Sequence, residues 1–64
     1  MKVGITLSNG EVVSLEKREY KDRVVYDCDS KKQALDVILT LTEIGNFCKL
    51  FGDEHTNYSV IVLK

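Results

Sequence analysis

The sequence has no proline, only one histidine, and no long apolar run. No stretch approaches the roughly 20 apolar residues of a membrane span, and Met1 and Lys2 lead straight into an alternating pattern instead of the apolar core of a signal peptide. Low-complexity segments, internal repeats and linkers are also missing. We therefore expect residues 1–64 to form one compact domain in the cytoplasm, without membrane contact.

Cysteine is scarce, with Cys28 and Cys48 as its two occurrences. Two cysteines do not make the disulfide framework of a small secreted domain, and without a secretory signal a reducing compartment is expected. The prediction is two buried thiols. Sequence spacing leaves a bond between Cys28 and Cys48 open, because it says nothing about their distance in the fold.

No excess of charge of one sign is present, since nine basic and ten acidic residues give a formal net charge of -1. Such a chain has no general field that would draw it to nucleic acid or anionic lipid. Basic residues concentrate only between residues 16 and 23, where Glu16, Glu19 and Asp22 alternate with them. These carboxylates cancel most of the local potential, so a solvated strand end and turn is expected there.

The chain opens with a β-hairpin, in which apolar and polar residues alternate on both sides of a turn that ends at Gly10. A two-residue turn would mix polar residues into the apolar face. A three-residue loop, closed by Gly10 in the left-handed region, pairs Ile5 with Val13 and Val3 with Leu15. We predict the three-residue loop, because a slip of one residue turns every side chain over.

A third strand is predicted from Arg23 to Cys28, and a helix follows it. Ser30 and Gln33 fit a capping box, in which each side chain satisfies a backbone donor at the helix start. The helix shows apolar residues at the spacing of one face. These residues are Ala34, Val37, Ile38, Leu41, Ile44 and Cys48.

The end of the helix has two interpretations. Gly45 and Asn46 could form a C-cap, but the apolar pattern continues through residues 47–51, and we predict an end near Phe51. A loop then leads to a last strand from Asn57 to Leu63.

The predicted fold class is α+β, with element order β-β-β-α-β and a four-stranded mixed sheet that has the helix packed on one face. If the last strand returns parallel to the first, the strand order is 3-2-1-4, with this apolar strand at an edge. Addition beside the third strand is the alternative. In outline the hairpin, single helix and returning strand resemble β-grasp proteins, a likeness of architecture that implies no function.

One helix covers only one face of such a sheet, so apolar side chains are left over. They are either scattered surface residues or an interface on the outer sheet face, on the helix flank or along an edge strand. The predicted partner-binding residues are Leu35, Leu39, Val12, Val25 and Val60.

No arrangement of residues indicates catalysis, metal binding or a cofactor. Asp27 and Asp29 lie beside the helix start, where capping and the helix dipole explain them. The segment from Asp53 to His55 has metal-ligand types without a second cluster. Cys28 with His55 lacks a third orienting group and an oxyanion hole. We expect neither an enzyme nor a small-molecule substrate.

The functional hypothesis is a small protein-interaction module, a regulator or inhibitor of the kind that phages and mobile elements often encode. It would bind a partner protein or a second copy of itself as a homodimer. The alternative is a nucleic-acid-binding module, which the charge balance disfavours. In that alternative Tyr20 and Tyr26 stack on bases. Its phosphate contacts would be Lys17, Arg18, Lys21 and Arg23.

Overall fold

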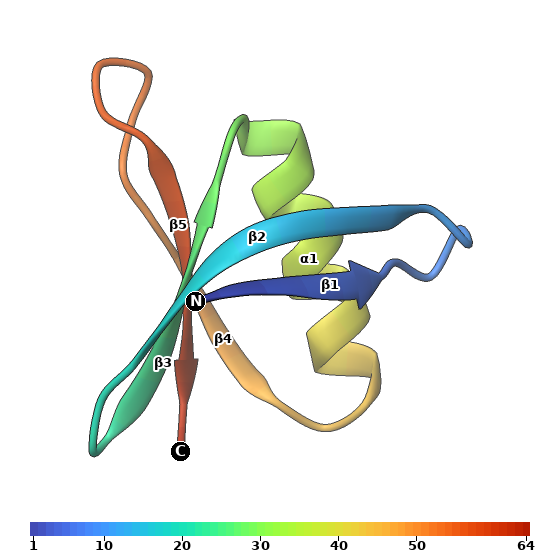
Figure 1. The fold of residues 1–64 in the computed structure, drawn as a ribbon, viewed down its shortest axis with the longest axis horizontal. Coiled ribbons are helices and arrows are strands. Elements are labelled where there is room, and N and C mark those ends of the chain that lie inside the picture. Colours follow the sequence, from blue (N-terminus) through green and yellow to red (C-terminus); the bar gives the residue numbers. More distant parts are fainter.

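The computed structural model describes residues 1–64 as a five-stranded antiparallel sheet with one helix across one face (Figure 1). The fold is therefore α+β with a single helix, as predicted, but the sheet has one strand more than expected and contains no parallel pair. In chain order the elements are β1 Lys2–Thr6, β2 Val12–Glu19, β3 Arg23–Cys28, α1 Lys31–Glu43, β4 Phe47–Phe51 and β5 Tyr58–Leu63.

The first hairpin has the three-residue loop that the apolar pattern predicted. Ile5 lies opposite Val13 in the β1–β2 register. Gly10 adopts φ 91°, and its N–H donates to the Leu7 carbonyl at 2.9 Å. Leu7 in turn donates to the Glu11 carbonyl at 2.7 Å, which closes the loop. The positive φ explains why glycine stands at this position.

Helix α1 begins where the capping signal placed it. Ser30 is the N-cap, and its hydroxyl accepts from the Gln33 N–H at 3.1 Å. The Gln33 side chain reaches one residue further back than a capping box requires, and its Oε1 accepts from the Asp29 N–H at 2.7 Å. No helix in the structure combines the length and the apolar character needed to cross a membrane.

The predicted helix end near Phe51 is wrong. Helix α1 ends at Glu43, Gly45 has φ 97°, and the Asn46 N–H donates to the Leu41 carbonyl at 3.0 Å. The glycine and asparagine therefore terminate the helix, as in the alternative interpretation. The apolar residues beyond them form β4, because pairing with β5 satisfies their backbone groups and places them along the sheet.

The strand order is β1-β2-β3-β5-β4, so the last strand lies beside the third strand, as in the alternative placement, and the parallel return beside the first strand is wrong. Strand β5 lies between β3 and β4 and is antiparallel to both. This interior position suits a strand that is apolar on both faces, with Val60 toward the helix and Ile61 away from it. No two neighbouring strands of this sheet are parallel.

The sheet is strongly twisted, so that β1 and the first half of β2 run across the direction of β3 and β5 (Figure 1). Strand β2 pairs with β1 through residues 12–16 and with β3 through residues 16–19. The core lies between the sheet and α1. Its buried members are Leu7, Leu15, Cys28, Ala34, Val37, Leu41, Val60 and Val62.

Both cysteines are free thiols, and β5 separates their strands. Cys28 is buried, and burial raises its pKa from 9.0 to about 11, with a smaller contribution from the carboxylates of Asp27 and Asp29. Cys48 is half-buried, and burial raises its pKa too. Sequence left a disulfide open, and the structure excludes it because the two strands are not neighbours.

We expect the Cys28 thiol to make stability depend on pH in the alkaline range. The unfolded thiol ionises near its ordinary pKa, whereas the folded thiol keeps its proton to about pH 11. The stabilisation is therefore complete below pH 9 and is lost as the pH rises toward 11. Thermal unfolding of the native chain and of Cys28→Ala measures this contribution as the difference between their slopes against pH. Parallel slopes would contradict it.

Candidate functional site on the outer sheet face

The face of the sheet opposite α1 carries a groove of about 740 Å³. Strand register explains its composition, because Arg18, Val25 and Ile61 stand opposite one another on β2, β3 and β5 and therefore share this face. Tyr20 and Arg23 border the groove at the β2–β3 turn. The β4–β5 connection borders its other end, with Phe51, Asp53, Thr56 and Asn57.

Two arginines flank Tyr20 at the turn end of the groove. The Arg23 Cζ atom lies 5.3 Å from the centroid of the Tyr20 ring, in cation–π geometry. Arg18 Nη1 lies 3.4 Å from the Tyr20 hydroxyl, and Arg18 Nη2 lies 2.9 Å from Asp27 Oδ1. The same carboxylate oxygen accepts from the Ser59 hydroxyl at 3.1 Å. A continuous series of contacts thus holds these side chains in place.

The two arginines differ in how closely their guanidinium groups are paired with carboxylates of the protein. The hydrogen bond with Asp27 and the charge of that carboxylate raise the pKa of Arg18. Arg23 has its only ion pair with Asp22, at 3.8 Å and between exposed side chains. The Arg23 guanidinium therefore keeps most of its donors for a ligand.

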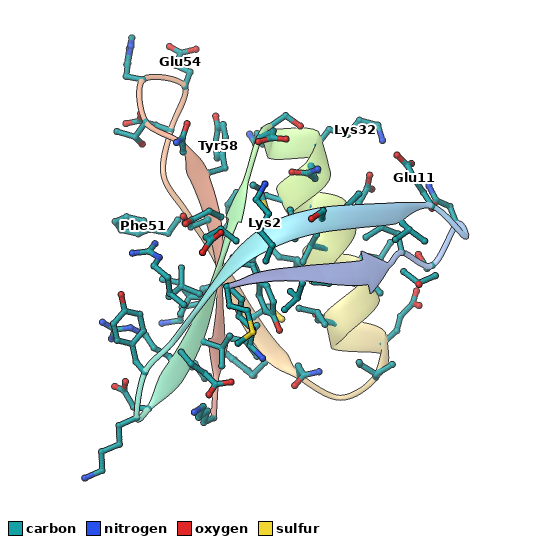
Figure 2. All side chains as sticks on the ribbon, in the orientation of Figure 1. Lys2, Glu11, Lys32, Phe51, Glu54 and Tyr58 are labelled. Atoms are coloured by element: carbon teal, nitrogen blue, oxygen red, sulfur yellow. The ribbon has the colours of Figure 1, made fainter.

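The floor and one wall of the groove are apolar. Val25 is on the predicted outer face but only 6% exposed, so its expected accessibility is wrong. Ile61 beside it is half-buried. The Phe51 side chain is 66% exposed, and Figure 2 shows its ring on the side of the sheet away from α1. Together they form an apolar surface next to the arginines.

The basic segment of the sequence is divided between the two faces of the sheet. Arg18, Tyr20 and Arg23 come together at the groove, whereas Lys17 and Tyr26 are register partners on the helix side. Lys17 Nζ lies 3.1 Å from the Glu19 carboxylate, and this contact raises the lysine pKa. Lys21 is exposed in the β2–β3 turn.

The predicted partner-binding residues lie in four different places. Leu35 and Leu39 are about half exposed on α1, and Val12 is 68% exposed near the first hairpin loop. Val25 forms part of the groove floor. Val60 is completely buried against α1, so its predicted place on an accessible surface is wrong. On β5 the outer face carries Ile61 and Leu63, and the inner face carries Val60.

The sequence prediction assigned Phe47 and Phe51 to the helix, with Phe47 near its polar side, and so missed that the two share one face of a strand. Both are about two-thirds exposed on β4. The signal that could have found them is the Gly45–Asn46 terminator. A strand beginning after it places Phe47, Lys49 and Phe51 on one face.

The segments considered for catalysis have structural roles. Asp53 Oδ1 accepts from the backbone N–H groups of His55 and Thr56, at 2.8 and 3.0 Å, and so orders its own turn. Cys28 faces the core, whereas the Asp27 side chain contacts Arg18 on the other side of β3. Cys28, Asp27 and His55 are therefore not brought into one pocket. No group of three or more His, Cys, Asp or Glu residues is placed to hold a metal ion.

Comparison with protein-family models, with curated proteins and with solved structures finds no match to this chain.

Proposed function

We propose that this protein is a small protein-binding module, which acts as a regulator or inhibitor by occupying the surface of a partner protein. The observation that supports the proposal is the outer-face groove, in which exposed Tyr20, Arg23 and Phe51 surround an apolar floor. Tyrosine and arginine are enriched among the few residues that contribute most of the binding energy of protein interfaces. A solvated rim of Asp53, Thr56 and Asn57 completes this arrangement.

The groove is preorganised for binding. Arg18 is held by Asp27, and Tyr20 lies between the two guanidinium groups. Side chains that are already ordered lose less conformational entropy when a partner binds. Arg23 remains free to form a bidentate contact with a carboxylate of the partner.

Nucleic-acid binding is the second candidate, because the groove places Tyr20, Arg18 and Arg23 on one open sheet face. Aromatic and basic residues on such a face can stack bases and contact phosphates. Three features favour a protein partner instead. Asp27 neutralises Arg18, Lys17 and Tyr26 lie on the opposite face, and the chain has a net charge of -1.

The test compares the native chain with the double variant Tyr20→Ala, Arg23→Glu. Loss of the two side chains that border the turn end of the groove is expected to weaken capture of the partner from source-cell extract at least about thirtyfold, as for interface hot spots. Thr6→Ala is the matched control, because Thr6 is exposed, on the same sheet face and outside the groove. Circular dichroism verifies that both variants fold.

Two results would contradict the proposed function. One is equal capture of the same proteins by the native chain and the double variant. The other is a mobility shift of single-stranded oligonucleotides that salt abolishes and that the double variant lacks, which would assign the groove to nucleic acid.

A further inference from the structure

Strand β4 forms a free edge of the sheet, and the orientation of its backbone follows from neighbouring hydrogen bonds. Lys64 donates to the Asp22 carbonyl at 3.2 Å, in continuation of the β3–β5 register. Because peptide groups alternate along a strand, Ile61 directs its backbone groups toward β4, where Lys49 is its partner. The N–H and C=O groups of Cys48 and Leu50 therefore point to the open side.

Apolar side chains flank this edge on both faces of the sheet. On the outer face Phe47 and Phe51 are 69% and 66% exposed. On the inner face Leu50 is 36% exposed, and the half-exposed Leu35 and Leu39 lie along the adjacent flank of α1. The placement of that flank follows from helix geometry, because α1 contacts β4 and Thr40, on the opposite side of the helix from Leu35 and Leu39, contacts Ser8 of the first hairpin.

The opposite edge of the sheet, β1, does not share these features. The residues on its outer face are Lys2, Gly4 and Thr6. On the helix side, Thr40 accepts the Ser8 N–H at 3.0 Å beyond the end of the strand. The apolar surface suited to strand addition is therefore confined to β4.

Lys49 decides which strand can pair with this edge. In a two-fold antiparallel pair of β4 strands, all open groups of Cys48 and Leu50 find partners only when Lys49 faces Lys49 of the second copy. Shifting the register by two residues involves Gly52, which has φ 111°, or Asn46, whose N–H is used by the helix end. Two opposed ammonium groups disfavour self-pairing, as charged residues do on many edge strands.

We propose that β4 accepts an extended segment of a partner protein that places an acidic residue opposite Lys49 and an aliphatic residue on either side of it. Those two aliphatic side chains pack on Leu50, Leu35 and Leu39, and the acidic one pairs with Lys49 on the outer face. The inference rests on the proposed function only in that the partner is a protein. It uses residues other than the arginines and tyrosine of the groove.

The variant Lys49→Glu provides a probe of this chemistry, because its own β4 then carries an acidic residue between Cys48 and Leu50. Light scattering after size exclusion, under reducing conditions and over a range of concentrations, is expected to give 7.3 kDa for each protein alone. An equimolar mixture is expected to form a heterodimer at least about tenfold more tightly than either protein self-associates. Both chains carry net negative charge and repel each other at long range, so long-range electrostatic attraction cannot produce this result.

Matched variants identify the surface that pairs. Leu39→Lys, introduced into both proteins, is expected to abolish the heterodimer, whereas Thr6→Lys, at an exposed position on the opposite edge strand β1, leaves it intact. A mixture that associates no more than its components would overturn the inference. So would a native chain that dimerises as tightly as the mixture, because Lys49 would then not select the partner. Neither result bears on the groove, which the Tyr20 and Arg23 substitutions test separately.

Discussion

Replacing Leu15 by alanine is expected to lower the free energy of unfolding by about 3 kcal/mol, the usual cost of a cavity left by a buried leucine. Leu15 is 2% exposed and lies in the middle of β2, where it joins the hairpin to the core beneath α1. A domain of this size has a total stability of only about 3–10 kcal/mol. The loss is therefore a large fraction of the total stability, and urea denaturation followed by circular dichroism measures it.

Val12→Ala is the control, because Val12 lies in the same strand but is 68% exposed. Its substitution is expected to change stability by less than about 0.5 kcal/mol. Equal losses for the two variants would show that Leu15 is not part of a closely packed core.

Gly52→Ala is expected to cost about 2–4 kcal/mol, because two independent penalties act at this position. Gly52 has φ 111°, which disfavours any residue with a side chain, and a Cβ atom there would lie 2.5 Å from the Asn57 carbonyl oxygen. Gly52 and Asn57 both belong to the short connection between β4 and β5, and the Asn57 oxygen is a backbone atom. The change therefore requires the connection to move, and thermal or urea unfolding measures its cost.

Two other glycines separate these penalties. Gly10→Ala meets no atom within 4 Å but keeps the unfavourable φ of 91°, and is expected to cost about 1 kcal/mol. At Gly4 a Cβ atom would make an ordinary contact of 3.9 Å with Val12, and the effect is expected to be small. A different order of the three variants would contradict this account of the turns.

The groove and the β4 edge meet at Phe51, which forms a wall of the first and ends the second. Gly52 and the Asp53 turn follow it immediately and hold the β4–β5 connection. On the two proposals above, one partner protein would add a strand to β4 and place a neighbouring segment over Tyr20 and Arg23. The two proposed contacts are therefore compatible within a single complex.

Local chemistry was sufficient to predict the first half of the fold from the sequence. The alternation of apolar residues and Gly10 defined the hairpin register, and Ser30 with Gln33 defined the start of α1. These features depend on residues close in the chain, where side-chain period and backbone conformation leave few alternatives. The division of residues 23–28 between the two faces of β3 was predictable for the same reason.

The second half depended on contacts distant in the sequence. Residues 47–51 suit either a helix face or a strand, and only pairing with β5 makes them β4. Likewise Val60 and Ile61 are equally apolar, and the position of β5 between β3 and β4 determines which faces α1. The groove and the β4 edge are consequences of that strand order. Sequence periodicity therefore determined the individual early elements, whereas the tertiary structure decided which apolar residues remained accessible, because burial depends on what packs against them.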